Sequence, residues 1–341
     1  MEYRHLGRSG LRVSELSLGS WVTFDTQVKV DAAMEMMTAA YDAGINFFDN
    51  AEAYAKGESE KVMGAALKKL GWRRSSYLVS TKFYWGLTDG VNQKNTLNRK
   101  YLMEAIDGSL KRLGLDHVDL VFCHRPDAAT PIEETVGALG DAIRAGKIRY
   151  WGLSNFASWR AAQACETADR MGVPRPIASQ PYYNAMNRMP EVEHLPACAA
   201  YGLGIVPYSP VARGVLTGKY PVDGPPPKGT RTGHADKRMM ESEYRRESLE
   251  IAQIVRDHAE RRGMTAAQFA TLWVLNNRLI TAVIAGPRTM AQWTEYLGAL
   301  NHEFTAEDEA LIDSLVPPGH PSTPGYTDPN HPVIGRPVHS R

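Results

Sequence analysis

Cysteine is scarce in this chain, and long apolar runs are missing. The three cysteines, Cys123, Cys165 and Cys198, are too few and too scattered for a disulfide framework or a zinc site. No apolar stretch approaches the roughly 20 residues that a membrane-spanning helix requires. Residues 1–5 lack the apolar core of a secretory signal. We therefore expect no metal centre, no membrane insertion and a cytoplasmic location.

An excess of charge of either sign is also missing. Lys and Arg total 39 and Asp and Glu total 38, so the formal net charge is +1. This balance gives no electrostatic footprint for nucleic acid or for an anionic membrane. The hydrophobic content of 43% is normal for a globular protein that buries a full core. The expected partner is a small molecule, not nucleic acid.

The glycine-rich fingerprint GxGxxG of Rossmann domains does not follow the first predicted strand. Gly202-Leu203-Gly204 is too short for this fingerprint and leads into another predicted strand. The absence argues against a Rossmann dehydrogenase.

Short apolar runs alternate with helical patterns along most of the chain. The predicted strands are residues 16–18, 45–48, 77–81, 120–123, 148–153, 177–179, 204–207 and 282–285. The predicted helices are residues 30–43, 59–70, 100–113, 133–145, 157–171, 190–201, 249–262, 266–276, 290–300 and 306–315. This alternation indicates a parallel sheet with crossover helices. The spacing favours an α/β fold of the closed (β/α)8 TIM barrel type, at about residues 15–316 of a single 1–341 domain.

Three segments fall outside the alternation. Residues 3–14 carry turn signals between short runs and predict a β-hairpin that caps the barrel floor. Residues 209–246 predict a long loop at the barrel mouth, of a length typical of a functional lid or of disorder. Residues 317–341 are rich in proline, so this tail is expected to be extended or docked and not helical.

Polar residues end the predicted strands, where the chemistry of such barrels is found. The first three are Asp49, Lys82 and His124. Ser154, Asn155, Gln180, Tyr208 and Ser209 follow at the later strand ends. Each alone is compatible with a surface group or a structural ion pair. An acid, a lysine and a histidine that face one mouth are a catalytic arrangement.

With these residues in view, the sequence resembles the aldo-keto reductases, in the branch that contains the potassium-channel β-subunits and their bacterial relatives. The resemblance covers about residues 3–316 and is strongest in GINFFDNAEAYAKGESE at 44–60. It continues in LVSTK at 78–82, DLVFCHRPD at 119–127, GLSNF at 152–156, SQ at 179–180, YSPVARGVLTGKY at 208–220 and IAGPRTMAQWTEYL at 284–297. Taken together, these motifs indicate this family specifically.

The resemblance implies a catalytic tetrad of Asp49, Tyr54, Lys82 and His124. Tyr54 would protonate the carbonyl oxygen, since a free phenol has a pKa of about 10 and remains protonated at neutral pH. Lys82 would stabilise the phenolate and pull the pKa of Tyr54 down. Asp49 would hold Lys82, and His124 would orient the carbonyl. The channel subunits carry Asn where this chain has His124, which favours turnover here.

The resemblance also implies a nicotinamide cofactor, NADP(H), extended across the barrel mouth. Ser154, Asn155 and Gln180 would bind the carboxamide, Tyr208 would stack on the nicotinamide ring, and Ser209, Val211 and Gly214 would line the pyrophosphate. Trp21 and Gly286 complete the expected cofactor set, with Lys219 and Arg231 in a loop that would close as a strap.

The expected preference for NADP over NAD rests on Arg288. A guanidinium fork suits the 2′-phosphate, and Arg288 lies where a helix opens. Gln292 and Glu295 would reach the adenosine, whereas Tyr296 stands where family members usually carry Asn, so it would stack instead of hydrogen-bonding.

The substrate is expected to be a small carbonyl compound. Trp21, Phe24, Tyr84 and Trp85 follow strand ends and predict an aromatic wall, although packing would explain them equally well. Aryl aldehydes and sugar-like carbonyl compounds both remain candidate substrates. By resemblance we expect a homo-oligomer, a tetramer or an octamer.

Two other functions stay open from the sequence. One is a regulatory or redox-sensing subunit that holds NADP(H) and turns over slowly, like the channel subunits. The other is a barrel hydrolase that uses Glu52 or Asp49 as its general acid.

Overall fold

The eight predicted strands form one parallel sheet in the computed structural model of the protein. The structure describes residues 1–329 apart from 22–23, 25–28, 226, 228–229 and 231–236. The strands are β3 (Leu16–Gly19), β4 (Phe47–Asp49), β5 (Leu78–Phe83), β6 (Val118–Cys123), β7 (Ile148–Ser154), β8 (Ala178–Gln180), β9 (Gly204–Ile205) and β10 (Val283–Ala285). They pair in the order β10-β3-β4-β5-β6-β7-β8-β9.

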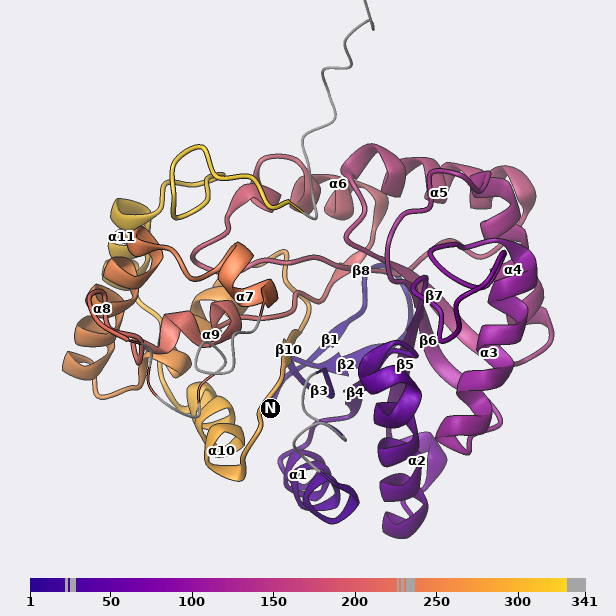
Figure 1. Ribbon diagram of the computed structural model, residues 1–341, viewed down its shortest axis with the longest axis horizontal. Helices are drawn as coiled ribbons and strands as arrows, with labels where there is room; N and C mark the ends of the chain where they lie inside the picture. The colour runs from indigo at the N-terminus through magenta and orange to yellow at the C-terminus, as the bar shows by residue number, and fades with distance from the viewer. Residues whose placement is uncertain (22–23, 25–28, 226, 228–229, 231–236, 330–341) are drawn as a thin grey trace, which may run out of the picture.

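Two isolated backbone bridges near β9 and β10 close this sheet on itself. Tyr208 pairs with Ile284, and Ile205 pairs with Ile280, both in parallel. The Ile284 N–H donates to the Pro207 oxygen at 3.0 Å. These bridges join β9 to β10, and Figure 1 shows the helices around the outside of the strands. The prediction of a (β/α)8 barrel is confirmed.

The helices lie close to their predicted bounds. They are α1 (Val30–Asp42), α2 (Glu58–Leu70), α3 (Arg99–Leu113), α4 (Ile132–Arg144), α5 (Ser158–Met171), α6 (His194–Tyr201), α7 (Lys237–Ser242), α8 (Arg246–Arg261), α9 (Ala266–Asn276), α10 (Met290–Gly298) and α11 (Ala306–Leu315). Their apolar faces are buried against the sheet; in α4, for example, Val136, Leu139 and Ala142 are fully buried. Among the described residues, none of the helices combines the length and apolarity needed to cross a bilayer.

Two predicted segments differ from the structure. The predicted helix 190–201 is divided into a 3-10 turn at Met189–Glu191 and α6 from His194. Pro196 lacks an N–H, so it is tolerated in the first turn of a helix that starts at His194 but not inside a longer one. The predicted loop 209–246 contains a 3-10 segment at Ala212–Thr217 and the short helix α7.

The N-terminal hairpin plugs the floor of the barrel, as predicted. Strands β1 (Tyr3–His5) and β2 (Arg12–Ser14) pair antiparallel. Leu6 and Val13 are buried with Phe47 of β4, Phe122 of β6 and Val206, which directly follows β9. The hairpin therefore completes the apolar core inside the barrel.

The described part of the C-terminal tail, residues 317–329, is docked and contains no helix. The Ser322 N–H donates to the Met186 oxygen at 2.9 Å, and the His320 oxygen accepts from the Arg188 N–H at 3.0 Å. Further along, Asp328 pairs with both terminal nitrogens of the Arg238 guanidinium. The tail thereby ties α7 to the barrel.

Gly7→Ala should destabilise the protein by at least about 2 kcal/mol. Gly7 has a φ of +63°, and an added Cβ would stand 2.3 Å from the Gly202 oxygen and 2.7 Å from the Ile177 oxygen. Urea unfolding measures the loss. Gly10→Ala is the matched control, because a Cβ at Gly10 meets nothing within 4 Å. Equal stability of the two variants would contradict this account of the floor.

Candidate active site

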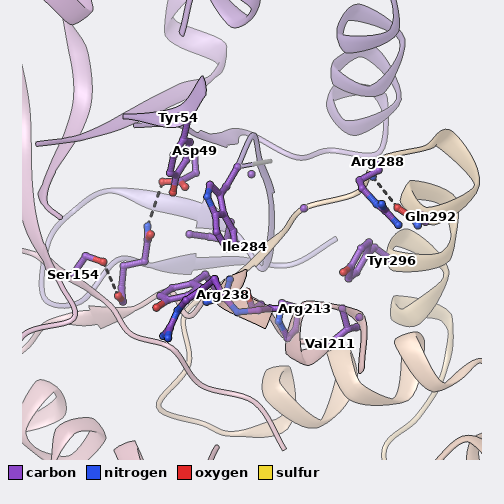
Figure 2. Close-up of a pocket in the computed structure, with 18 of the residues that line it drawn as sticks. Asp49, Tyr54, Ser154, Val211, Arg213, Arg238, Ile284, Arg288, Gln292 and Tyr296 are labelled. Carbon is purple, nitrogen blue, oxygen red and sulfur yellow. Dashed lines mark hydrogen bonds between the residues drawn. The ribbon is translucent and has the colours of Figure 1, made fainter. Parts of the chain in front are cut away.

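A cavity of about 450 Å³ opens at the carboxyl ends of the strands. Residues at or just beyond five strand ends line it: Asp49, His124, Ser154, Gln180 and Gly286. Its size is within the range of small-molecule sites. Figure 2 shows Tyr54 and Asp49 toward one side of this pocket and Arg288, Gln292 and Tyr296 toward the other.

Lys82 and Asp49 form a buried ion pair on the Tyr54 side of the pocket. The side chain of Lys82 is completely buried, and its Nζ donates to Asp49 Oδ2 at 2.5 Å. It also donates to the Asn50 backbone oxygen at 2.8 Å and to the Tyr54 hydroxyl oxygen at 3.1 Å. All three ammonium protons are therefore used, which compensates the cost of burying the charge.

The other oxygen of Asp49 is equally constrained. Asp49 Oδ1 accepts from Ser80 Oγ at 2.6 Å and from Gln180 Nε2 at 3.2 Å. Asp49 thus accepts hydrogen bonds at both oxygens, from Lys82 at one and from two neutral donors at the other. Asp49 is therefore placed to hold Lys82, and not to donate a proton as the hydrolase hypothesis requires.

A turn with unusual backbone angles directly follows Tyr54. Ala55 and Lys56 have φ values of +48° and +53°, and Gly57 follows at +89°. Left-handed angles at two non-glycine residues cost free energy and persist only where packing enforces them. Tyr54 itself lies five positions beyond the end of β4, and its hydroxyl oxygen accepts from Lys82 Nζ at 3.1 Å.

Burial, followed by the charge of Asp49 and the nearby Tyr208, raises the pKa of Tyr54 well above its ordinary value. Burial lowers the pKa of Lys82, and the Asp49 carboxylate opposes this change. In the resting protein the net shift of the Tyr54 pKa is therefore upward, with burial as its largest cause. Tyr54 is a phenol whose oxygen already accepts from Lys82, so its own proton is left for another acceptor.

His124 lies edge-on to Tyr54, with ring centroids 5.8 Å apart. Burial, followed by the positive charges of Lys82 and Arg125, lowers the pKa of His124 well below its ordinary value. The imidazole is therefore neutral at physiological pH. Its Nδ1 atom is buried and has no hydrogen-bond partner among the described residues.

Four polar side chains extend this cluster along the mouth. Asn155 Nδ2 donates to Ser154 Oγ at 2.9 Å, and Asn155 Oδ1 accepts from the Tyr208 hydroxyl at 2.9 Å. Ser154 Oγ donates to the Gln180 backbone oxygen, while the Gln180 amide reaches Asp49. Asn155 has a φ of +59°, an angle that asparagine adopts more readily than most residues. The network fixes these groups relative to the ion pair.

The second side of the pocket lies at the start of α10. The Arg288 N–H donates to Gln292 Oε1 at 2.8 Å, and Thr289 caps the helix by accepting from the Gln292 N–H. Arg288 therefore precedes the cap by one residue. Glu295 and Tyr296 line the same end.

Most residues that the sequence predicted lie around this pocket. Its walls include Trp21, Tyr54, Trp85, Asn155, Tyr208, Ser209, Val211, Gly214, Lys219, Gly286, Arg288, Gln292 and Glu295. Lys82 lies beneath Tyr54 and is absent from the wall. Arg231 lies outside the described residues.

The predicted aromatic wall is smaller than expected. Tyr84 is not among the described residues of the lining; its ring contacts the Trp85 ring edge-on, with centroids 5.0 Å apart. Phe24 is buried in the apolar core instead. Trp21 and Trp85 are the predicted aromatics that face the pocket. Phe24 and Tyr84 instead pack with the apolar core of the protein.

Several lining residues were missed from the sequence. They are Gly19, Ala53, Ala55, Pro210, Arg213, Thr217, Arg238, Ala267 and Ile284, together with Arg125, which directly follows His124. Pro210, Arg213 and Thr217 lie inside the YSPVARGVLTGKY motif, which is the signal that could have found them. Arg238 reaches the pocket from α7, within a segment predicted to be loop.

The barrel and its mouth match a known family. A sequence profile of the Aldo/keto reductase family matches residues 15–317. The chain belongs to the aldo/keto reductase family. Enzymes of this family generally bind NAD(P)H.

Two plant relatives are similar over nearly the whole chain. Both are named "Probable voltage-gated potassium channel subunit beta". The protein from Oryza sativa subsp. japonica is 44% identical over 321 residues, which cover 92% of this chain and 97% of the relative. The protein from Arabidopsis thaliana is 41% identical over 302 residues, or 88% and 92% of the two chains. The resemblance drawn from the sequence is confirmed.

Glu52 is the second acid that the hydrolase hypothesis required. It is absent from the described lining of the pocket, and its Oε1 accepts from the Gly86 N–H at 3.2 Å. Burial, reinforced by the charge of Glu60, raises the pKa of Glu52 to about 7. Folded Glu52 therefore keeps its proton up to a higher pH than an exposed glutamate does.

The stability of the protein should fall as pH rises from about 4.5 to about 7, because folded Glu52 keeps a proton that the unfolded chain releases. Glu52→Gln, which is neutral at every pH, should lose less stability across this window. Urea unfolding at a series of pH values measures the slope. Glu58→Gln, an exposed acid of the same segment, is the control. An unchanged slope in Glu52→Gln would remove Glu52 as the cause.

Proposed function

We propose that this protein reduces an aldehyde or ketone with NADPH, with Tyr54 as the general acid. The observation that carries the proposal is the hydrogen bond from the buried Lys82 ammonium to the Tyr54 hydroxyl at the wall of the pocket. A carbonyl that gains a hydride at carbon needs a proton at oxygen. Of the described lining residues, the Tyr54 phenol is the donor held by a buried cation.

The pocket residues fit an extended nicotinamide cofactor. Gly286 lines the mouth, and a Cβ there would meet nothing within 4 Å, so a ligand can approach the backbone closely. Ser154, Asn155 and Gln180 would hold the carboxamide, and Tyr208 would stack on the ring. Ser209, Val211, Gly214 and Lys219 would follow the pyrophosphate. When bound, the cofactor supplies the hydride.

The proton transfer follows from the resting geometry. An alkoxide is a much stronger base than a phenolate, so it takes the Tyr54 proton even though burial has raised the pKa of Tyr54. Lys82 then faces a phenolate at hydrogen-bonding distance, and Asp49 keeps Lys82 in position. His124, neutral and 5.8 Å from Tyr54 between ring centroids, would orient the carbonyl oxygen by hydrogen bonding.

The preference for NADP over NAD is supported by Arg288. Its guanidinium lines the pocket one residue before the cap of α10, where helix N–H groups also favour an anion. Gln292 and Glu295 would contact the adenosine, and Tyr296 offers an aromatic face for the adenine. Trp21 and Trp85 would contact the substrate. We further propose a cytoplasmic homo-oligomer.

The plant relatives support a second candidate, a subunit that binds NADP(H) and regulates a partner. His124 favours the reductase over the regulatory subunit, because the channel subunits carry Asn at this position. Stopped-flow oxidation of bound NADPH by 4-nitrobenzaldehyde separates the two. Repeated turnover supports the reductase, and a single slow oxidation supports the regulatory subunit.

Tyr54→Phe should lower turnover roughly 100-fold or more, because the hydroxyl proton is lost. The affinity for NADPH should stay within a few-fold, since the ring remains. Steady-state kinetics with 4-nitrobenzaldehyde and fluorescence titration with NADPH measure the two effects. Unchanged turnover would refute the role of Tyr54 as the acid.

Arg288→Ala should weaken NADPH binding roughly tenfold or more, because a charged hydrogen bond to the 2′-phosphate is removed. NADH has no 2′-phosphate, so its affinity should change little. Fluorescence titration with both nucleotides gives the comparison. Equal weakening of the two would assign Arg288 a different role.

A further inference from the structure

Arg213 is a buried arginine in the wall of the pocket that none of the roles above uses. The residue is 8% exposed. Its guanidinium lies over the Trp21 ring, 4.7 Å from the centroid. Its Nη1 atom is buried and makes no hydrogen bond to any described residue. A buried guanidinium with an unused donor is costly unless a ligand completes it.

Among the described residues, Glu243 is the acidic side chain that pairs with Arg213. Arg213 Nε lies 3.5 Å from Glu243 Oε1, and the Nε atom also makes no hydrogen bond within the described part of the chain. Glu243 is 3% exposed, so this pair is shielded from water. The contact holds the guanidinium in place without satisfying its donors. Within the described part of the chain, the Nε and Nη1 donors of Arg213 are therefore both without an acceptor.

The backbone at Arg213 is strained. Ser209, Ala212 and Arg213 have φ values of +58°, +45° and +54°, and Gly214 follows at +98°. Three left-handed non-glycine residues within five positions are costly and are typical of ligand-binding segments. Lys219 lies close by, since a Cβ on Gly214 would stand 3.2 Å from its Nζ. The segment thus brings two cations to one part of the wall.

The position of Arg213 along the pocket indicates the ligand group. In Figure 2, Arg213 lies between the side that holds Tyr54 and Ser154 and the side that holds Arg288 and Tyr296. A dinucleotide that spans these sides places its pyrophosphate in the middle. The pyrophosphate carries two negative charges, and a guanidinium binds phosphate oxygens through paired N–H donors.

We propose that Arg213 binds the pyrophosphate of the dinucleotide, with Trp21 and Glu243 holding its guanidinium in position. The inference rests on the proposed function, since it requires a dinucleotide in this pocket. It assigns Arg213 to the central charge of the ligand, whereas Arg288 is assigned to the 2′-phosphate at one end.

The test compares two probes, NADPH and adenosine 2′-monophosphate, which has the 2′-phosphate but no pyrophosphate. Arg213→Met keeps an unbranched, flexible side chain and removes its charge and its N–H donors. It should weaken NADPH at least about tenfold and change the affinity for adenosine 2′-monophosphate less than about twofold. Arg288→Ala should weaken both probes. Isothermal titration calorimetry measures all four affinities.

Two controls exclude a general effect of charge removal and a loss of folding. Arg175→Met removes the same charge from an exposed arginine that pairs with Asp169, so it should leave both affinities unchanged. Arg213→Met leaves Glu243 buried without its cation, which can destabilise the fold. The double variant Arg213→Met/Glu243→Gln removes that charge, and it should show the same selective loss of NADPH affinity.

The outcomes separate the two proposals. Wild-type NADPH affinity in the double variant would overturn the assignment of Arg213, and so would an equal loss for both probes. Failure of the wild-type protein to bind NADPH would instead overturn the proposed function.

Discussion

The buried pair of Asp49 and Lys82 is the interaction on which the site depends. A lysine with no exposed surface keeps its charge here because three acceptors surround it, and one of these is the phenol that faces the pocket. Removal of either partner would leave an uncompensated charge inside the barrel. The pair therefore constrains both the fold of the β4–β5 region and the position of Tyr54.

The rest of the mouth is arranged around this pair by a chain of hydrogen bonds. Gln180 reaches Asp49 from β8, the Ser154 hydroxyl contacts the Gln180 backbone, and Asn155 joins Ser154 to Tyr208. Side chains from four separate strand ends are thus held in one frame. A rigid frame of this kind suits a ligand that must be oriented and not only bound.

The sequence predicted the barrel well because strand–helix alternation is a local pattern. Asp49, Lys82 and His124 were readable at strand ends, since parallel strands bring their carboxyl ends to one mouth. Four features were not readable. The break before His194 depends on how Pro196 is placed, the burial of Phe24 depends on packing, and Arg238 reaches the pocket only because α7 forms in a segment without a strong helical pattern. The raised pKa of Tyr54 depends on desolvation, which no sequence pattern reports.

The ion pair between Arg238 and Asp328 joins a wall of the pocket to a segment beyond the last barrel helix. Part of the pocket surface is therefore supported by residues that contribute no strand to the barrel. Changes in the tail can reshape that surface while the Asp49–Lys82 pair and the strand ends stay as they are. The selectivity of the mouth and the chemistry beneath it can accordingly vary independently in the course of evolution.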